Sequence, residues 1–168
     1  MMAFDATPRF TSPSVMAPTP AWMILSFTRS LESFATTRHH VLLNELDDVR
    51  SRITVLTRAR GAWRRSPVPG LPPLASAWAT AVDEETSDDY WLTVTDFLTP
   101  TSLYLGNVGN PAREKLKQTP AFFDGSRHTV SQHEAISKDG TRIPYFEVAP
   151  SKLTLDGHAP TLLTRHSR

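Results

Sequence analysis

Six histidines are the residues of this chain best suited to proton transfer or metal binding. His39 and His40 come directly before a predicted strand, and neighbouring side chains of a strand point to opposite faces. His128 and His133 are five residues apart, an odd spacing that divides them between the two faces if both lie on one strand. The spacing of these histidines therefore predicts no metal site.

Two short motifs look like pieces of catalytic sites. His133 and Glu134 begin like a zincin signature, but Ser137 stands where the second histidine belongs. His166 and Ser167 combine a base with a nucleophile, yet they are adjacent near the terminus, without a third group to orient the histidine or an oxyanion hole. The sequence contains no Gly-x-Ser-x-Gly nucleophile elbow. We predict no catalytic, cofactor-binding or metal-ligating residue in this chain, and no cofactor.

Two charged segments could bind ions or nucleic acid. Residues 83–89 hold five carboxylates but lack the spacing and glycine of an EF-hand, so a solvated loop between strands is the better interpretation. The basic stretch 58–65 holds four arginines around Trp63, which could contact phosphates and stack on bases. The whole chain has a net charge of only +1, so we predict that Trp63 packs between strands and that nucleic acid is not a partner.

Composition and length exclude several classes of protein. The chain has 168 residues, enough for about one domain. It has no cysteine, which excludes disulfides, thiolate zinc sites, iron–sulfur clusters and a cysteine nucleophile, and leaves the compartment open, with the cytoplasm as the default. The most apolar run near the start, Ala21–Phe27, is too short for a spanning helix or a secretory signal, so we predict no membrane partner.

Short runs rich in β-branched and aromatic residues predict an all-β chain. Strands are expected at residues 40–45, 51–57, 76–82, 90–96, 102–108, 130–137 and 142–148, with weaker candidates at 62–65 and 161–163. The Asp-Gly pair of residues 138–141 predicts a hairpin turn between the last two strong candidates. Moderate helical propensity occurs at residues 29–38 and 112–118, in neither case with an apolar stripe.

The chain matches itself when it is shifted by 49 residues. Residues 41–43 then fall on residues 90–92, Asp47 falls on Asp96, and residues 55–56 fall on 104–105. A strand, an aspartate-containing turn and a second strand therefore recur in register. A period of 40–50 residues made of strands is typical of propeller blades, and two ordinary hairpins of another antiparallel sheet are the alternative that spacing leaves open.

Several segments resemble the prolyl oligopeptidase family of serine peptidases. Residues Ser137–Phe146 are similar to the Ser-Lys-Asp-Gly-Thr-(Lys/Arg)-(Val/Ile)-Pro hairpin that opens the main part of the family's hydrolase domain. The resemblance covers roughly residues 30–163. Its other parts are a late propeller blade and a connecting segment, at residues 41–56, 88–100, 114–117, 120–124 and 132–133.

This resemblance implies a partial β-propeller followed by the first β-hairpin of an α/β-hydrolase domain. Residues 1–29 would be a disordered or unrelated segment, residues 30–124 the last propeller blades, and residues 125–168 the start of the peptidase domain. In the family, a Ser-Asp-His triad hydrolyses short peptides, often after proline, and the propeller restricts access to it.

The chain departs from the family's pattern after Leu163. The family continues with a loop like Tyr-Gly-Tyr-Gly-Gly-Phe, whereas this sequence reads Thr164–Arg168. We therefore expect a fragment without the catalytic triad that is inactive alone, and whether the chain is an enzyme stays open. The alternatives are a non-catalytic propeller lid or interaction module, which could complement a separate hydrolase portion, and the product of a frameshifted gene.

Overall fold

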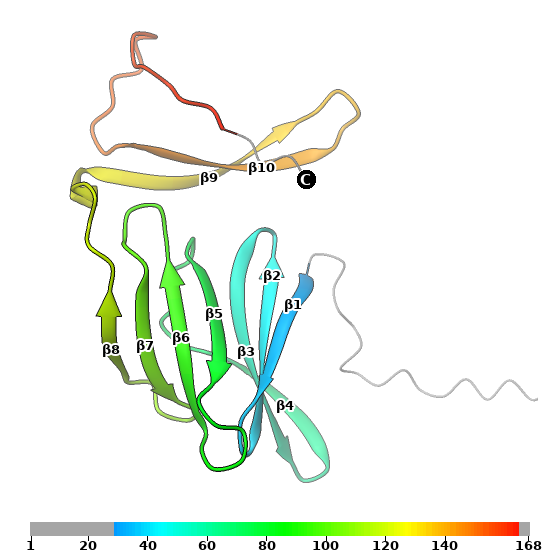
Figure 1. The fold of residues 1–168 in the computed structure, drawn as a ribbon. Coiled ribbons are helices and arrows are strands. Elements are labelled where there is room, and N and C mark those ends of the chain that lie inside the picture. Colours follow the sequence, from blue (N-terminus) through cyan, green and yellow to red (C-terminus); the bar gives the residue numbers. More distant parts are fainter. Residues whose placement is uncertain (1–28, 165–168) are drawn as a thin grey trace, which may run out of the picture.

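A computed structural model describes residues 29–164, which form three antiparallel sheets and contain no α-helix (Figure 1). The first sheet has the order β1 (Arg29–Thr36), β2 (His40–Asp47), β3 (Arg50–Ala59), β4 (Ala62–Pro67). The second has the order β5 (Ser76–Ala81), β6 (Asp89–Thr95), β7 (Ser102–Asn107), β8 (Arg113–Gln118). A single 3-10 turn, Gly125–Arg127, then leads into the hairpin of β9 (His128–Ile136) and β10 (Arg142–Pro150).

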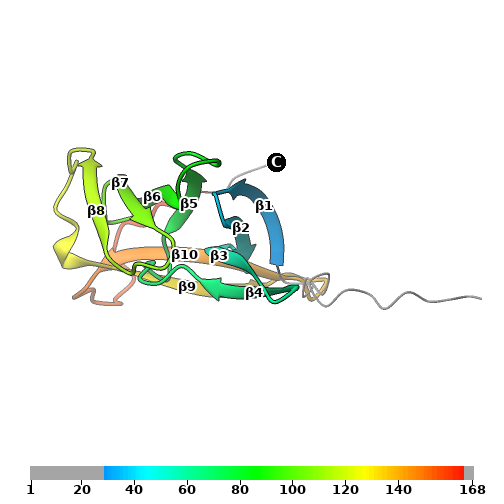
Figure 2. The ribbon, with the colours of Figure 1, turned by 90° about the horizontal axis from the view of Figure 1, so that it is seen from below.

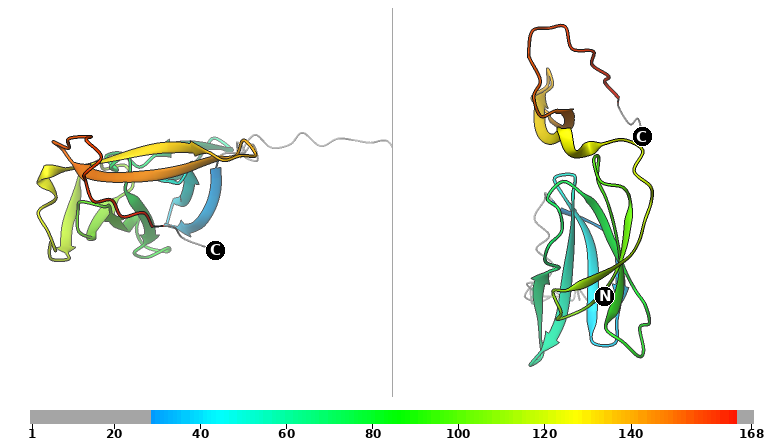
Figure 3. Two further views of the ribbon diagram at one scale, coloured as in Figure 1. Left: turned by 90° about the horizontal axis from the view of Figure 1, so that it is seen from above. Right: turned by 90° about the vertical axis from the view of Figure 1, so that its left-hand side faces the viewer.

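Both four-stranded sheets have the up-and-down arrangement of a propeller blade, because strands adjacent in sequence are adjacent in the sheet. The shift of 49 residues aligns β2 with β6 and β3 with β7, so the internal repeat is a repeat of blades. The prediction of an all-β partial propeller followed by a hairpin is confirmed. Figure 2 and Figure 3 show that the hairpin lies across the ends of both blades.

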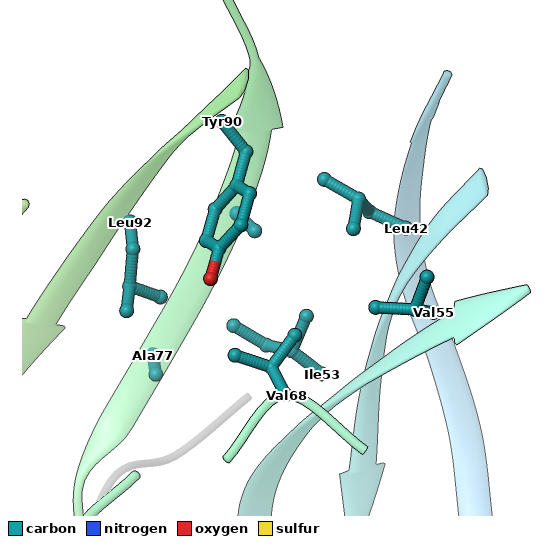
Figure 4. Packing of buried hydrophobic residues seen from close by; sticks show 8 residues of the cluster. Leu42, Ile53, Val55, Val68, Ala77, Tyr90 and Leu92 are labelled. Atoms are coloured by element: carbon teal, nitrogen blue, oxygen red, sulfur yellow. The ribbon is translucent and has the colours of Figure 1, made fainter. Parts of the chain in front are cut away.

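The core lies where the two blades face each other (Figure 4). In β3, Ile53 and Val55 alternate with polar residues, so both point to the same face and are buried there. The small side chains of Ala77 and Ala79 let β5 approach the first blade closely. The full cluster is Leu42, Ile53, Val55, Val68, Ala77, Ala79, Tyr90 and Leu92.

One buried amide ties the blades together inside this apolar interface. Asn44 is 3% exposed; its Nδ2 donates to the carbonyl of Ala79 at 3.0 Å, and its Oδ1 accepts from the Ala79 N–H at 2.8 Å. The same Nδ2 also donates to Ser33 Oγ at 2.8 Å. Asn44 thus behaves like a short piece of extra strand that pairs with the backbone of β5 across the blade boundary.

The acidic segment 83–89 makes a second connection between the blades. Asp88 Oδ1 accepts from Thr37 Oγ1 at 2.9 Å and from the His39 N–H at 2.8 Å, and its Oδ2 lies 2.8 Å from His39 Nδ1. Arg38 N–H donates to the carbonyl of Ser87 at 3.0 Å. The expected solvated loop is therefore correct only for its exposed first part, because Asp88 is half-buried and holds the turn between β1 and β2.

The Asp88 contact should make the stability of the blade pair depend on pH. Burial raises the pKa of Asp88, but the hydrogen bonds from His39 and Thr37 outweigh burial and hold the pKa below its usual value. A carboxyl with a lowered folded-state pKa stabilises the fold above about pH 4, the unfolded value, and this contribution is lost as pH falls through the folded value. We expect Asp88→Asn to lower the melting temperature at pH 7 and to have a smaller effect at about pH 2.5, because protonation of Asp88 at low pH removes the charge that these hydrogen bonds stabilise.

Thermal melts of the native chain and the Asp88→Asn variant at both pH values test this expectation. Glu85→Gln is the matched control, since Glu85 is an exposed carboxylate of the same segment. An Asp88→Asn effect of the same size at both pH values would contradict the assigned role of the carboxylate.

One sequence prediction of local structure is wrong, and two weak local preferences are overridden. The segments with helical propensity, 29–38 and 112–118, contain the edge strands β1 and β8, because pairing with β2 and β7 outweighs a weak local preference. Residues 161–163 form no strand and pair with no strand in the described part of the chain. The predictions for residues 1–28 lie outside the described residues.

Candidate functional site at the joint between blade and hairpin

The turn between β2 and β3 contacts the hairpin through a small hydrogen-bonded group. Arg50 Nε donates to Gln132 Oε1 at 2.6 Å, and Gln132 Nε2 donates to the carbonyl of Asp48 at 3.3 Å. We call these three residues the blade–hairpin joint. They lie beside a hollow of about 450 Å³, which is lined by Asp47, Asp48, Arg50, Arg52, Gln132, His133 and Glu134.

The local backbone explains why the Asp48 carbonyl is available to the hairpin. The aspartate-containing turn expected between the strands at 40–45 and 51–57 is a tight turn in which Asp48 and Val49 have φ values of 47° and 63°. Positive φ at both central positions is the geometry of a hairpin turn that follows the twist of its strands. For the β-branched Val49 this backbone conformation is strained, so the turn is held by the structure around it.

Ion pairs fix the charged side chains on the blade side of the joint. Asp47 Oδ2 lies 2.6 Å from Arg52 Nε and 3.2 Å from Arg29 Nε. The carboxylate thereby connects the first strand of the blade to the third. This places Arg29 and Arg52 next to Arg50 at the end of the blade that faces the hairpin.

The hairpin carries its own cross-strand pairs. His133 Nε2 lies 2.9 Å from Glu147 Oε2, and the His133 ring stacks on Tyr145 with 5.3 Å between centroids. Arg142 Nη1 donates to Glu134 at 2.9 Å. These pairs keep the two strands in register, so that Gln132 is presented to the blade.

A second contact holds the hairpin to the other blade. The rings of Phe97, in the turn after β6, and Phe146 of β10 have centroids 5.2 Å apart. Below the hairpin, a Cβ added to Gly125 would lie 2.8 Å from the carbonyl oxygen of Leu98, so the connecting segment passes very close to this turn. Each blade therefore contacts the hairpin at one end.

The histidines singled out by the sequence do not form one cluster, although the rings of His39 and His40 lie edge to face with 6.5 Å between their centroids. His39 is bound to Asp88, and His40 Nδ1 lies 2.8 Å from Thr57 Oγ1. His128 and His133 lie on opposite faces of β9, as their spacing predicts; His128 faces the ring of Phe123, and its buried Nδ1 has no partner within residues 29–164. His166 and Ser167 lie outside the described residues. No group of three or more metal-binding side chains occurs between residues 29 and 164.

The aromatic residues lie in several different environments. Tyr90 and Tyr104 belong to the interface between the blades. Trp63 does not pack between strands: it is half-exposed and lies opposite Arg58 at the outer end of the β3–β4 hairpin. Phe97 contacts the hairpin instead of the neighbouring blade, and Trp91 points to the face of the second blade away from the core.

The joint residues were missed by sequence reasoning. Gln132 belongs to a stretch that was noted only for its resemblance to a family, and Arg50 was part of a predicted turn. The two residues are 82 positions apart, so no local motif contains both. Within the described residues, no helix is long and apolar enough to cross a membrane.

Comparisons with known proteins agree with this architecture. No family model matches the chain. An uncharacterized peptidase, y4nA, from Sinorhizobium fredii is 31% identical over 163 residues, which is 97% of this chain and 22% of that protein. An uncharacterized peptidase, RP174, from Rickettsia prowazekii is 29% identical over 76% of this chain and 18% of that protein. The chain thus spans about a fifth of the length of these relatives.

A solved prolyl endopeptidase superposes on 80% of this chain with a TM-score of 0.68 and 29% identity, and the match covers 19% of the endopeptidase. The chain resembles the prolyl oligopeptidase family over most of its length. Oligopeptidase B from Trypanosoma brucei has a similar fold over 77% of this chain, with a TM-score of 0.65 and 17% identity. The family's propeller thus accounts for the two blades and for their 49-residue repeat.

The joint should behave as one cooperative contact. We expect Arg50→Ala and Gln132→Ala each to cost about 1 kcal/mol, the usual net value of a hydrogen bond, and the double variant to cost little more than either alone. Amide hydrogen exchange of β9 should rise to the same extent in all three variants. Arg58→Ala, which removes an exposed arginine far from the hairpin, is the control. Additive effects in the double variant would show that Arg50 and Gln132 act separately.

Proposed function

We propose that this chain connects the last blades of a β-propeller to the first hairpin of an α/β-hydrolase domain, in a peptidase that cleaves short peptides after proline. The proposed boundaries are residues 30–124 for the blades and 125–168 for the start of the peptidase domain, and Arg29, which the sequence boundary leaves outside, begins β1 of the first blade. The observation that carries the proposal is the blade–hairpin joint, in which Arg50 and the Asp48 carbonyl hold Gln132.

We further propose that the joint regulates access to a catalytic centre. The contact between the blades and the hairpin rests on a few exposed hydrogen bonds and one aromatic pair, which are individually weak and can break without unfolding either part. The solved prolyl endopeptidase that superposes with a TM-score of 0.68 comes from a structural and mechanistic study of two such enzymes. That study concerns the role of inter-domain dynamics in catalysis and specificity. A weak contact between the blades and the hairpin would allow the propeller and the hydrolase domain to move relative to each other.

In the proposed role, the catalytic residues that hydrolyse the peptide lie outside this chain. Peptide hydrolysis of this type needs a serine activated by a histidine. No histidine ring within residues 29–164 is hydrogen-bonded to a serine; the paired rings contact Asp88, Thr57 and Glu147. In the proposed role, the chain positions the peptide's path and the hydrolase domain, and does not cleave the peptide itself.

An assay of the purified chain with a chromogenic proline-containing peptide tests this division. We expect no turnover above the buffer rate from a sample whose circular dichroism spectrum shows β-structure. Turnover that follows the chain through successive purification steps, and that is abolished in a serine variant such as Ser167→Ala, would contradict the proposed role.

A further inference from the structure

A groove rich in arginine opens beside the first part of β3. β4 pairs with β3 only between Thr54 and Ala59, and the chain then turns away after Val68, whose N–H donates to the carbonyl of Ile53 at 2.9 Å. The Arg50–Arg52 end of β3 consequently has no strand neighbour on that side in the described part of the chain. The space left there is about 480 Å³ and is lined by Arg29, Arg50, Ser51, Arg52, Arg65 and residues of the segment 66–73. We call it the arginine groove.

Three of the four arginines are held through Nε, the guanidinium nitrogen that is bonded to the side-chain stem. Nε of Arg29 and Nε of Arg52 form ion pairs with Asp47, and Arg50 donates a hydrogen bond through Nε to Gln132. The terminal Nη atoms of these three arginines have no hydrogen-bond partner among residues 29–164. Anchoring of this kind fixes the position of each guanidinium while leaving its outer donors for a ligand, which lowers the entropic cost of binding.

The fourth arginine is fixed by a buried carboxylate. Glu45 is 1% exposed and accepts from Arg65 Nη2 at 2.5 Å and from Thr54 Oγ1 at 2.5 Å. Four arginines and no carboxylate line the groove itself, whereas Asp47, Asp48 and Glu134 line the adjoining hollow with Arg50 and Arg52. The excess of positive charge is therefore confined to the groove. This excess predicts attraction of an anionic ligand.

The walls of the groove suit an extended chain rather than a small ion. Pro67, Pro72 and Pro73 line it opposite β3, and proline fixes the backbone of this segment. On the other side, the free edge of β3 at Ser51 can pair with the backbone of an added strand. Carboxylates on alternate residues of such a strand would reach the arginines, which bind carboxylate with two parallel hydrogen bonds.

We propose that the arginine groove binds an acidic peptide in extended conformation. The site would recognise carboxylate side chains by Arg29, Arg50 and Arg52, and the peptide backbone by the edge of β3. This inference does not depend on the proposed peptidase role, because binding can be measured without any cleavage.

Fluorescence anisotropy with the full 168-residue chain tests the proposal. The probe is fluorescein-labelled Glu-Val-Glu-Val-Glu-Val, and the comparison probe has Gln in place of every Glu. We expect binding of the acidic probe at about 20 mM salt that weakens at about 200 mM, because salt screens exposed charges. The Gln probe should bind at least about tenfold more weakly, since it lacks the charge-assisted bonds.

Matched variants locate the site. The double variant Arg29→Gln/Arg52→Gln should weaken binding of the acidic probe by about tenfold or more, with the folded spectrum unchanged. Arg58→Gln/Arg64→Gln removes the same charge from exposed positions outside the groove and should change binding by less than about threefold. Equal losses in the two double variants would overturn the proposal, because binding would then follow net charge alone.

Two further measurements distinguish an acidic peptide from other possible occupants of the groove. If inorganic phosphate binds as tightly as the acidic probe, the groove is a simple anion site and the proposal is overturned. Sedimentation could instead show a dimer at low salt that the double variant Glu84→Gln/Glu85→Gln abolishes. In that case the acidic segment of a second copy occupies the groove, and the proposal of a separate peptide is overturned. The expected result is a monomer that binds the acidic probe and is displaced by unlabelled acidic peptide.

Discussion

Asn44→Ala should destabilise the chain by about 3 kcal/mol, because it leaves the N–H and the carbonyl of Ala79 buried without partners and each such group costs about 1–3 kcal/mol. For a domain of ordinary stability this is a large share of the total free energy of unfolding. The change acts at the boundary between the blades, so the two blades should separate before either unfolds. Urea unfolding followed by tryptophan fluorescence measures the loss.

Asn107→Ala is the matched control for this prediction. Asn107 also donates to a group distant in sequence, Asp89 at 2.7 Å, but at an exposed site where water replaces the lost bond. We expect a cost below about 1 kcal/mol for the control. If Asn44→Ala costs no more than Asn107→Ala, the buried amide does not hold the blades together.

Gly106→Ala is expected to cost about 2–3 kcal/mol, although alanine normally stabilises a strand relative to glycine. A Cβ at Gly106 would lie 2.5 Å from Cζ of Tyr90 and 2.7 Å from its hydroxyl oxygen. Tyr90 is buried in the core between the blades and lies directly opposite Gly106 in the sheet. Because Tyr90 is only 2% exposed, the extra methyl group must displace either β7 or the ring.

A double-variant cycle isolates this cause. In a Tyr90→Leu background the shorter side chain removes the clash, and Gly106→Ala should then be neutral or stabilising by up to about 1 kcal/mol. The free energy of unfolding of all four proteins gives the coupling. An equal cost of Gly106→Ala in both backgrounds would show that the glycine is needed for its backbone and not for Tyr90.

The strands that face the core were predictable, and those at the sheet edges were less so. Ile53 and Val55 alternate with polar residues because one face of β3 is buried, and the pattern records that burial directly. The edge strands β1 and β8 are exposed over most of their length, so their sequences carry no alternation and resemble helices. Their conformation is decided by pairing with β2 and β7, which local sequence does not encode.

The site was hidden from the sequence for a related reason. Arg50 and Gln132 meet only because two blades and a connecting segment fold between them, and neither residue type is unusual at its position. The same holds for Asp88, which lies in a segment that composition alone assigns to solvent. A resemblance to known peptidases places the hairpin after the blades, but only the folded chain shows which side chains join them.

The central claim is that these residues serve as the junction between propeller and hydrolase in a proline-directed peptidase, and a graft tests it most directly. Residues 29–164 would replace the segment of the solved prolyl endopeptidase that they match, which covers 19% of that chain. The measurement is kcat/KM on a chromogenic proline-containing peptide. The account predicts that the graft cleaves after proline and that Gln132→Ala in the graft changes kcat/KM. A folded graft whose serine still reacts with a covalent inhibitor but which cleaves no peptide would contradict it.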